Sequence, residues 1–395
     1  MKCEQLTLQP KLMAKLQEQR FEELTVIQEK CIPEINQGKD VVGQAETGSG
    51  KTLAFCLPIL NKIVPGRGLQ ALVLTPTREL CIQVTDVFKD FGKILGIRTT
   101  SVYGGVSIGP QIHDIRSSEV VIATPGRMLD HLRRKTIDLR GIKILVLDET
   151  DKMFEMGFVD DVEDIIRQIP SERQLLMFSA TISEDVHRLA RRHLKNPLII
   201  KTQSYVDHSK LKQVYYDIYE QNQKFSLLVH LLNKNTDGLS IVFCGTRHMS
   251  DAVQKNLTRQ GISASAIHGG MRQQKRSSSL DAIKTQKTKV LVATDVAARG
   301  LDIKNVTHIY NYDVPKTPTE YVHRIGRTAR AGAKGAAITL LTERDHDNFR
   351  RVQSNDDFQI ERADIPDFRK VPFMRRFEPR GHQSFRGPPR HSFGR

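Results

Sequence analysis

Residues 45–52 read AETGSGKT and stand between a short apolar stretch and the helix-like run LAFCLPIL. A strand, a glycine-rich turn and a helix in this order are typical of a phosphate-binding loop, since glycines let backbone N–H groups curl around anionic oxygens. Lys51 adds a full positive charge and Thr52 a hydroxyl that suits magnesium. An ordinary glycine-rich turn is the alternative, but lysine and threonine at these offsets disfavour it. The candidate phosphate-binding residues are Ala45, Thr47, Gly48, Ser49, Gly50, Lys51 and Thr52.

Short β-branched apolar runs recur along the chain at the spacing of strands that alternate with helices. This pattern predicts an α/β fold with buried parallel sheets. A second series begins after residue 210, so we expect two such domains in tandem. The first series comprises 40–43, 71–75, 120–124, 144–148, 175–179 and 198–201, and the second 240–244, 264–268, 290–294, 307–311 and 336–341.

The chain has 395 residues, more than one hydrophobic core usually serves, which agrees with two domains. We expect an N-terminal domain over 1–202, a linker at 203–210 where the polar QSYVDHSK lacks a period, and a C-terminal domain over 211–360. Residues 369–395 hold eight Arg or Lys and one acid among Phe, Gly and Pro. That composition predicts a basic, disordered tail over 361–395.

The chain is strongly basic, with 60 Lys and Arg, 45 Asp and Glu, and a net charge of +15. A surface of this charge attracts polyanions, although charge alone does not choose among RNA, DNA and acidic membranes. No apolar run is long enough to cross a bilayer. The five cysteines are scattered without CxxC spacing, which excludes a disulfide framework or zinc site and predicts a reduced, cytoplasmic protein.

The run ILVLDETD places two acids at the carboxyl end of a predicted strand, where open α/β sheets bind their ligands. Asp148 would hold magnesium, usually through water, and Glu149 would orient and deprotonate an attacking water. Acids at a strand end are often solvated turn residues, but a phosphate loop earlier in the same series reverses that preference. Farther along, HRIGRTAR at 323–330 offers arginines at three-residue intervals, which suit a γ-phosphate or form a solvated helix face.

With these motifs in order, the sequence resembles the DEAD-box family of ATP-dependent RNA helicases over about residues 3–360. The further motifs of the family follow the same order and make accidental similarity negligible. They are RFEELTVIQ ending at Gln28, PTREL at 76–80, GG at 104–105, TPGR at 124–127, SAT at 179–181, VFCGTR at 242–247, QQKR at 273–276 and ATDVAARGLD at 293–302.

The resemblance implies two tandem RecA-like domains that bind ATP and Mg²⁺ and hydrolyse ATP. Gln28 would recognise adenine, and Asp302 would approach the nucleotide from the second domain. Arg327 and Arg330 would act as arginine fingers beside Lys51, Asp148 and Glu149, with Thr52 and Asp148 serving the metal. Ser179, Thr181 and His323 would couple the ATP site to domain closure. The implied RNA contacts are Pro76, Thr77, Arg78, Gly105, Thr124, Gly126 and Arg127, then Arg247, Gly269, Gln273, Arg276 and Thr294.

The sequence departs from the family pattern at four places. Thr150 replaces the usual alanine of the DEAD tetrad, giving DETD, and the acids on either side are kept. Cys3 stands where the family often has an aromatic residue that packs on adenine, which loosens the expected base selectivity. Arg20 and Leu24 replace the common Gly and Pro of the Gln28 motif, and Glu46 stands where Gln is common.

We therefore expect an RNA-stimulated ATPase that binds single-stranded RNA across both domains and unwinds short duplexes locally. A clamp that uses ATP only to lock onto RNA is one alternative, and a DNA helicase on the same core is another. We expect a monomer and no membrane partner. Whether the protein binds ribonucleoprotein partners is left open by the sequence. Because backbone contacts carry no sequence information, the RNA substrate and pathway are not specified.

Overall fold

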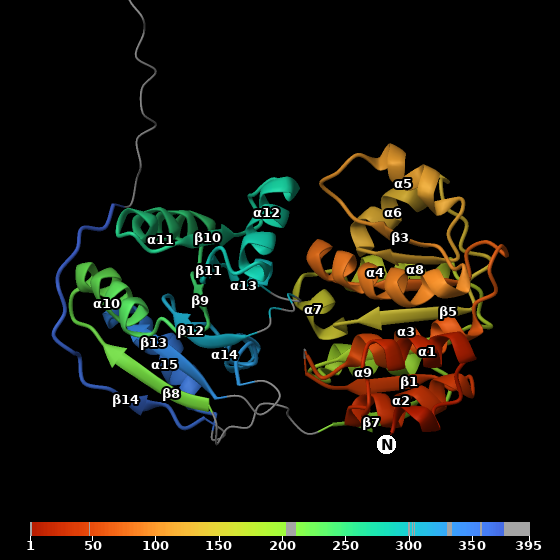
Figure 1. The fold of residues 1–395 in the computed structure, drawn as a ribbon, viewed down its shortest axis with the longest axis horizontal. Helices are drawn as coiled ribbons and strands as arrows, with labels where there is room; N and C mark the ends of the chain where they lie inside the picture. Colours follow the sequence, from red (N-terminus) through yellow and green to blue (C-terminus); the bar gives the residue numbers. More distant parts are fainter. Residues whose placement is uncertain are drawn as a thin grey trace, which may run out of the picture.

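The computed structural model describes residues 2–46, 48–202, 211–298, 301, 303, 305–329, 334–355 and 358–374, with only the backbone at 221 and 222. Each half of the chain forms one seven-stranded sheet flanked by helices, and the paired strands within each sheet are parallel (Figure 1). The expected fold class of two tandem parallel-sheet α/β domains is confirmed. The expected linker, 203–210, lies outside the described residues.

The first sheet has the strand order β3-β4-β2-β5-β6-β1-β7. Its strands are β1 (Val41–Gln44), β2 (Ala71–Leu74), β3 (Thr99–Val102), β4 (Val120–Ala123), β5 (Ile144–Asp148), β6 (Gln174–Ser179) and β7 (Leu198–Lys201). Its helices are η1 (Cys3–Gln5), α1 (Pro10–Glu18), α2 (Val26–Asn36), α3 (Lys51–Lys62), α4 (Arg78–Gly92), η2 (Lys93–Leu95), α5 (Ile108–Ile115), α6 (Pro125–Arg133), α7 (Thr150–Glu155), α8 (Val159–Arg167) and α9 (Glu184–His193).

The second sheet repeats this order as β10-β11-β9-β12-β13-β8-β14. Its strands are β8 (Leu211–Asp217), β9 (Leu239–Phe243), β10 (Ala264–Ile267), β11 (Val290–Ala293), β12 (Val306–Asn311), β13 (Gly335–Leu341) and β14 (Glu361–Arg362). Its helices are α10 (Gln221–Lys234), α11 (Arg247–Arg259), α12 (Gln273–Lys284), α13 (Asp295–Ala298), α14 (Pro318–Ile325), η5 (Glu343–Asp345) and α15 (His346–Gln353).

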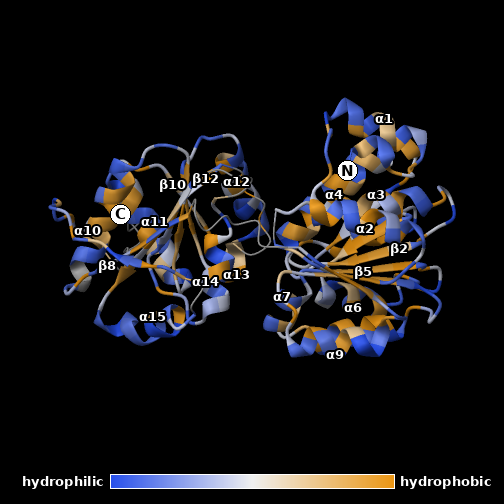
Figure 2. Cartoon of the chain, turned by 90° about the horizontal axis from the view of Figure 1, so that it is seen from below, coloured by the Kyte–Doolittle hydropathy of each residue, from blue (hydrophilic) through white to orange (hydrophobic). Residues whose placement is uncertain are grey.

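The central strands are apolar on both faces because helices cover both sides of each sheet. In β5, Ile144 and Val146 belong to one core cluster, while Leu145 and Leu147 belong to the other. This is the burial that alternating side chains of a covered parallel strand produce. Figure 2 shows the result, with hydrophobic colour concentrated on the strands and on the inner faces of helices.

Helix α4 shows how the sequence builds an element that later bounds the site. Thr77 caps it, since its Oγ1 accepts a hydrogen bond from the N–H of Leu80. Apolar residues at helical spacing, such as Leu80, Val84 and Phe88, are buried against the first core. The opposite side of α4 is free to face the second domain.

The expected tail begins with an ordered arm, which corrects the prediction of disorder from residue 361. β14 pairs in parallel with β8, and residues 363–374 then run over α10 and α11 (Figure 1). Val371 N–H donates to Ser226 Oγ at 3.0 Å, and Met374 N–H donates to Asn256 Oδ1 at 3.1 Å. Residues 375–395 lie outside the described part of the chain.

Two further expectations concern membranes and cysteines. Among the described residues, no helix is both long and apolar enough to cross a membrane. All five cysteines are free and buried, and burial raises the pKa of the Cys31 and Cys81 thiols to about 12. Cys3, the first residue of η1, is also buried.

Candidate functional site

The phosphate loop joins the end of β1 to the start of α3. Gly48 and Gly50 have φ angles of 90° and 93°, which glycine adopts without strain. A Cβ on Gly50 would lie 2.5 Å from Gln28 Nε2, so a side chain is excluded there for a second reason. Lys51 is buried and its Nζ donates to the Ala45 carbonyl at 2.6 Å. The loop therefore folds tightly around an ammonium group.

Two hydroxyl residues complete this loop. Ser49 Oγ is buried and finds no hydrogen-bond partner among the described residues. Thr52 follows Lys51 in the first turn of α3 and lines the same cavity as Asp148 and Glu149. A buried hydroxyl without a partner, beside a helix N-terminus, fits a loop that awaits an anion. Thr47 lies outside the described residues.

Gln28 links the N-terminal motif to the phosphate loop. It lies in the first turn of α2 and is buried. Its Oε1 accepts from the N–H of Thr25 at 3.0 Å, and its Nε2 donates to the Gly50 carbonyl at 3.1 Å. Both ends of the amide are therefore fixed, which holds Gln28 at the start of α3.

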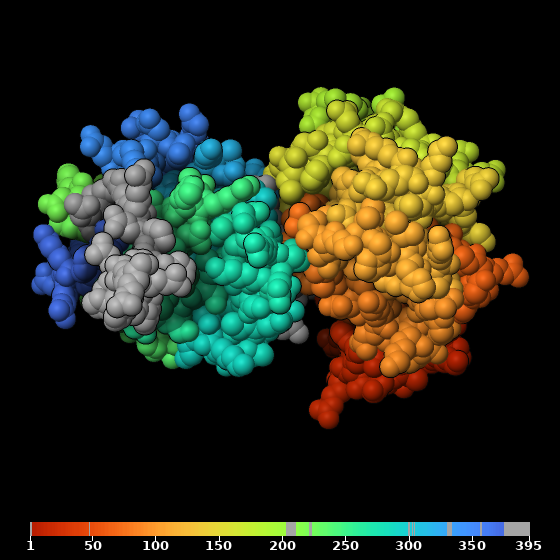
Figure 3. Space-filling model, turned by 90° about the horizontal axis from the view of Figure 1, so that it is seen from above, coloured from red at the N-terminus to blue at the C-terminus, as the bar shows by residue number. Residues whose placement is uncertain are grey.

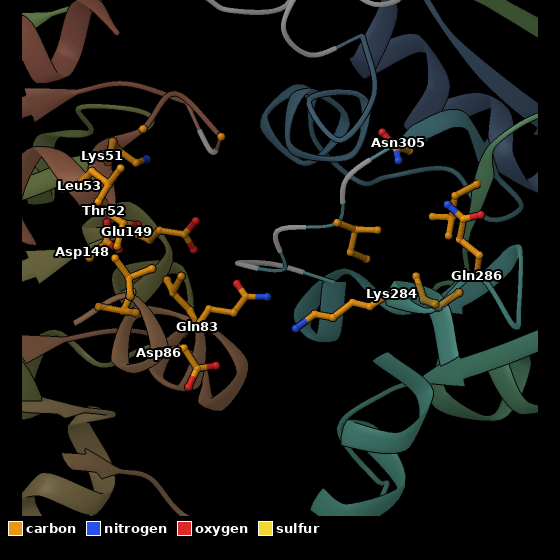
Figure 4. A pocket seen from close by; sticks show the side chains of 18 of the residues that line it. Lys51, Thr52, Leu53, Gln83, Asp86, Asp148, Glu149, Lys284, Gln286 and Asn305 are labelled. Atoms are coloured by element: carbon orange, nitrogen blue, oxygen red, sulfur yellow. The ribbon is translucent and has the colours of Figure 1, made fainter. Parts of the chain in front are cut away.

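The acidic pair lies at the carboxyl end of β5, facing the loop (Figure 4). Asp148 and Glu149 are each 2% exposed, and Glu149 has a left-handed φ of 53°. Burial raises the pKa of Asp148 to about 7. For Glu149, the charges of Lys152, Lys51 and Arg327 outweigh burial and hold its pKa at about 2. The nearest of these is Lys152, whose Nζ lies 2.8 Å from Glu149 Oε1.

Thr150, the residue that departs from the usual alanine, is accommodated by the fold. Its Oγ1 donates to the Leu147 carbonyl at 3.1 Å and lies 3.3 Å from the Phe178 carbonyl. The hydroxyl thus bonds β5 and β6 and does not compete for the acids. Threonine in place of alanine therefore adds no hydrogen bond to the carboxylates of Asp148 and Glu149.

The loop after β6 is bonded to α7 through Asp151. Thr181 donates to Asp151 Oδ2 from both its N–H, at 2.8 Å, and its Oγ1, at 2.9 Å. Ser179 Oγ accepts from the Asp151 N–H at 3.2 Å and donates to the Thr181 carbonyl at 2.7 Å. The proposed coupling residues Ser179 and Thr181 are thus connected directly to α7, the helix that begins immediately after the acids.

The second domain presents Arg327 to this site. Arg327 is buried, its Nη1 donates to the Leu301 carbonyl at 2.7 Å, and its charge acts on Glu149. Arg324 has a different environment, since Nε and Nη2 pair with Asp295 at 2.6 and 2.8 Å. His323 lies on α14 directly before Arg324 and is partly buried. Asp302 and Arg330 lie outside the described residues.

The predicted RNA contacts of the first domain follow three neighbouring strands, β3, β4 and β2. The loops after these strands meet, because a Cβ on Gly105 would lie 2.0 Å from Arg78 Nη1. Arg127 Nη2 donates to the Val106 carbonyl at 3.0 Å. The remaining residues of this group are Pro76 and Thr77 before α4, and Thr124 and Gly126 at the start of α6.

The second domain repeats this arrangement after β9, β10 and β11. Arg247 begins α11, and its Nη2 lies 3.3 Å from where a Cβ of Gly269 would stand. Thr294 follows β11. Gln273 and Arg276 lie on α12, but both side chains are turned toward the first domain.

The surfaces of the two domains meet beside the groups just described (Figure 3). A buried ion pair joins the domains at this end of their interface. Arg276 Nη2 lies 2.6 Å from Glu79 Oε2, and the two side chains are 9% and 3% exposed. Gln273 Nε2 donates to Glu79 Oε1 at 3.4 Å. Arg276 was expected to contact RNA, whereas here it pairs with Glu79 of the PTREL motif.

Several site residues were missed by sequence reasoning. Glu79, Asp151 and Lys152 lie inside the motifs PTREL and DETDK, so their position was a usable signal. Gln111 was not signalled by a motif, yet its Oε1 accepts from Arg127 Nη1 at 3.3 Å and lies 3.2 Å from His131 Nε2. In the described ranges there is no group of three or more His, Cys, Asp or Glu that could hold a metal.

Two family models match most of this chain. A family model described as DEAD/DEAH box helicase matches residues 25–189, and one described as helicase conserved C-terminal domain matches residues 223–332. The ATP-dependent RNA helicase CshA of Listeria monocytogenes is 43% identical over 89% of this chain and 68% of its own length. The chain belongs to the DEAD-box family of RNA helicases. The DEAD-box ATP-dependent RNA helicase RhpA of Helicobacter pylori is also 43% identical, over 91% of this chain and 74% of its own.

Solved DEAD-box relatives have the same architecture. S. cerevisiae Dbp5 bound to RNA and ADP BeF3 has a TM-score of 0.84 and 32% identity, covering 92% of this chain and 95% of its own. Mss116p bound to ssRNA and AMP-PNP has a TM-score of 0.81 and 27% identity, covering 91% and 78%. The expected tandem RecA-like fold is confirmed, and so is the expected class of enzyme, an ATP-dependent RNA helicase.

Proposed function

We propose that this DEAD-box helicase binds ATP between its domains and hydrolyses it with residues from both. Glu149 would accept a proton from water as the water oxygen attacks the γ-phosphorus, while the bond to the ADP oxygen breaks. Lys51 and Arg327 would stabilise the charge on the transferred group, with Arg330 as a second finger. The supporting observation is a cavity between the domains that is lined by Lys51, Asp148 and Glu149 of the first and by residues of the second. The charge of the buried Arg327, from the second domain, also lowers the pKa of Glu149.

The same proposal assigns the nucleotide contacts. Gln28 is fixed against Gly50 and would recognise the adenine edge, while the loop amides, Ser49 and Thr52 would hold the phosphates. Asp302, and Thr47 in the loop, would complete the set. The buried position of Cys3 favours an adenine contact that does not use this residue. Ser179, Thr181 and His323 would link the nucleotide to closure.

The residues fit magnesium, since Thr52 and Asp148 both offer oxygen atoms to the same cavity beside the phosphate loop. Few protein ligands suit this ion, which keeps several waters and takes phosphate oxygens from the nucleotide. Bound magnesium would neutralise charge on the β- and γ-phosphates. Titrating ATPase activity with the metal checks this assignment.

DETD would act as a working variant of the DEAD tetrad, because the Thr150 hydroxyl donates to backbone carbonyls.

RNA would bind across the loops that follow β2, β3, β4, β9, β10 and β11. Their glycines, threonines and arginines suit backbone phosphates and not base edges. A single strand held over both domains must follow the shape of the interface, which a regular duplex does not match, so closure would separate a few base pairs. The Glu79–Arg276 pair would favour the closed form beneath that strand.

This function predicts ATP turnover that RNA stimulates. Hydrolysis should rise on adding single-stranded RNA, stay low with DNA of the same sequence, and accompany separation of a short RNA duplex. Steady-state ATPase assays and a fluorescent duplex measure the two quantities. Equal stimulation by DNA would favour a DNA helicase, and RNA binding without strand separation would favour a clamp.

The basic segment 375–395 is proposed to add RNA affinity. It holds six Arg and one acid with interspersed Phe. Ending the chain after Met374 keeps the ordered arm and should lower the slope of log affinity against log salt by about 2 for single strands, if three arginines contact phosphates. Filter binding at several salt concentrations measures this slope, and ATPase activity in saturating RNA is the control. An unchanged slope would reduce the segment to a solubilising extension.

Three finer proposals accompany this function. A monomer is supported by the two-domain arrangement, in which one chain supplies both sides of the ATP site, and sedimentation checks it. A cytoplasmic location is supported by five free, buried cysteines, and cell fractionation checks it. Ribonucleoprotein partners would reach the helicase through its RNA, and recovery with and without ribonuclease checks that.

A further inference from the structure

A cavity of about 900 Å³ extends from the phosphate loop into the space between the two domains. It begins at Lys51, Thr52 and the acidic pair, and continues along α4 to residues of the second domain (Figure 4). Gln28, at the proposed adenine end, does not line it. The cavity therefore starts where a γ-phosphate would stand and leads away from the rest of the nucleotide.

Two helices bound this cavity and reach the proposed RNA site. On α4, Glu79 lies at the RNA end, and Gln83, Val84 and Val87 farther along line the cavity. On α12, Arg276 lies at the RNA end, and Ile283 and Lys284 at the other end line the cavity. The Glu79–Arg276 pair thus closes one end of an α4–α12 interface whose other end is open space.

The second-domain wall of the cavity is mixed, with polar and basic side chains beside the apolar Leu239, Ile283 and Ile303. Lys284 extends from the end of α12 into the cavity toward Gln83 and Asp86 (Figure 4). Its ammonium makes no hydrogen bond or ion pair within the described ranges. Lys289 also lines the wall, but its Nζ donates to the Thr236 carbonyl at 3.3 Å. Lys284 is therefore the lysine on this wall that can receive a passing anion without first leaving a partner.

After hydrolysis, two anions occupy the site and ADP stands between the released phosphate and the adenine end. Inorganic phosphate can then leave before ADP only in the other direction, past Glu149 and into the cavity. A hydrated phosphate is small relative to this volume. A cation on the wall, such as Lys284, lowers the barrier for a multiply charged anion that passes it.

We propose that the cavity between α4 and α12 is the exit route for inorganic phosphate, and that Lys284 assists its passage. The inference rests on the proposed ATP site and adds the path by which its product leaves. Because α4 and α12 also carry Glu79 and Arg276, release of RNA would loosen the same interface and widen the route. Phosphate release and RNA release are then expected to accelerate together.

Reversing the charge of Lys284 tests the route. In Lys284→Glu, phosphate release should slow by about three- to tenfold, as one charge changes sign at a solvated wall. Lys284→Gln should give a smaller effect in the same direction. Quenched-flow assays measure phosphate formed in the site, and stopped-flow with a fluorescent phosphate-binding protein measures phosphate released into solution. The proposal is supported if the delay between the two signals is shortest in the wild type, longer in Lys284→Gln and longest in Lys284→Glu.

Lys287→Glu is the matched control, because Lys287 is exposed in the same loop and does not line the cavity. It changes net charge equally and should leave the delay unchanged. Equal effects at both lysines, or no delay in Lys284→Glu, would overturn the route. If the wild-type chain forms no phosphate in the quenched-flow assay, the proposed hydrolytic site is wrong, which is a different outcome from failure of the route.

Discussion

Replacing Glu149 by glutamine is expected to lower ATP turnover by roughly 10²–10⁴-fold, the usual contribution of a general base. The amide keeps the size of the side chain and an oxygen that can accept from Lys152, which lies 2.8 Å away in the wild type. Affinity for ATP and RNA should therefore change little. Single-turnover ATPase assays, with separate nucleotide and RNA binding measurements, distinguish lost chemistry from lost binding.

Glu172→Gln is a suitable control for this change. Glu172 is exposed between α8 and β6, so the same chemical substitution occurs far from the site. Its turnover should equal that of the wild type. Undiminished hydrolysis in Glu149→Gln would remove Glu149 from the role of base and leave water activation to another group.

Most strands that sequence patterns predicted are buried on both faces. β2 and β4 are wholly apolar, and β5 is apolar up to Asp148, so their runs were visible without any partner. β3 was missed because Thr99, Thr100 and Ser101 give no apolar run, although its neighbour β4 pairs with it. β8 begins where the second series was expected, but its adjacent Lys212 and Gln213 interrupt the apolar run and hid its limits.

The C-terminal arm was missed for a related reason. Its apolar residues are sparse and interrupted by prolines, which resembles a disordered composition. The structure shows that Phe368, Val371 and Phe373 pack on the core beside α10, with Phe373 4.9 Å from Phe225 between ring centroids. A few spaced contacts to an existing surface can order a segment that has no periodicity of its own.

Several motifs of the site, such as the phosphate loop after β1 and the acidic pair at the end of β5, could be located because they stand at the end of a strand and so at a predictable edge. Contacts between motifs could not. Asp151 with Thr181, and Glu79 with Arg276, join residues 30 and 197 positions apart, and no local pattern reports such distances. These contacts place polar partners where burial requires them.

The two sheets have matching strand order, with β8 in the place of β1, yet they do not carry equal sites. In the first domain, Lys51 at the start of α3 folds into a glycine loop. In the second, Lys224 in the first turn of α10 is buried and pairs with Asp345 at 2.9 Å. The Asp345 carboxylate thus pairs with Lys224, which is the counterpart of Lys51. In the proposed mechanism the second domain would supply arginines, and not a phosphate loop, to the nucleotide.

Replacing Arg327 by alanine is expected to lower ATP turnover by about 10³-fold or more, the effect of losing an arginine finger. Arg327 approaches Glu149 from the second domain, so its charge reaches the reaction only when the domains are together. Lysine at this position should restore little activity, because a single ammonium lacks the planar fork of guanidinium. Turnover at saturating ATP and RNA is the quantity to measure.

Arg324→Ala provides the contrast that separates catalysis from folding. Arg324 is 2% exposed and bonds Asp295, Asn311 Oδ1 at 3.0 Å and the Asp313 carbonyl. Its loss leaves these buried groups without their hydrogen-bond partner and should destabilise the second domain by about 3–5 kcal/mol. Arg327→Ala should unfold much closer to the wild-type temperature in calorimetry. If Arg327→Ala loses stability as Arg324→Ala does while the folded fraction keeps its turnover, Arg327 is a structural residue and not a finger.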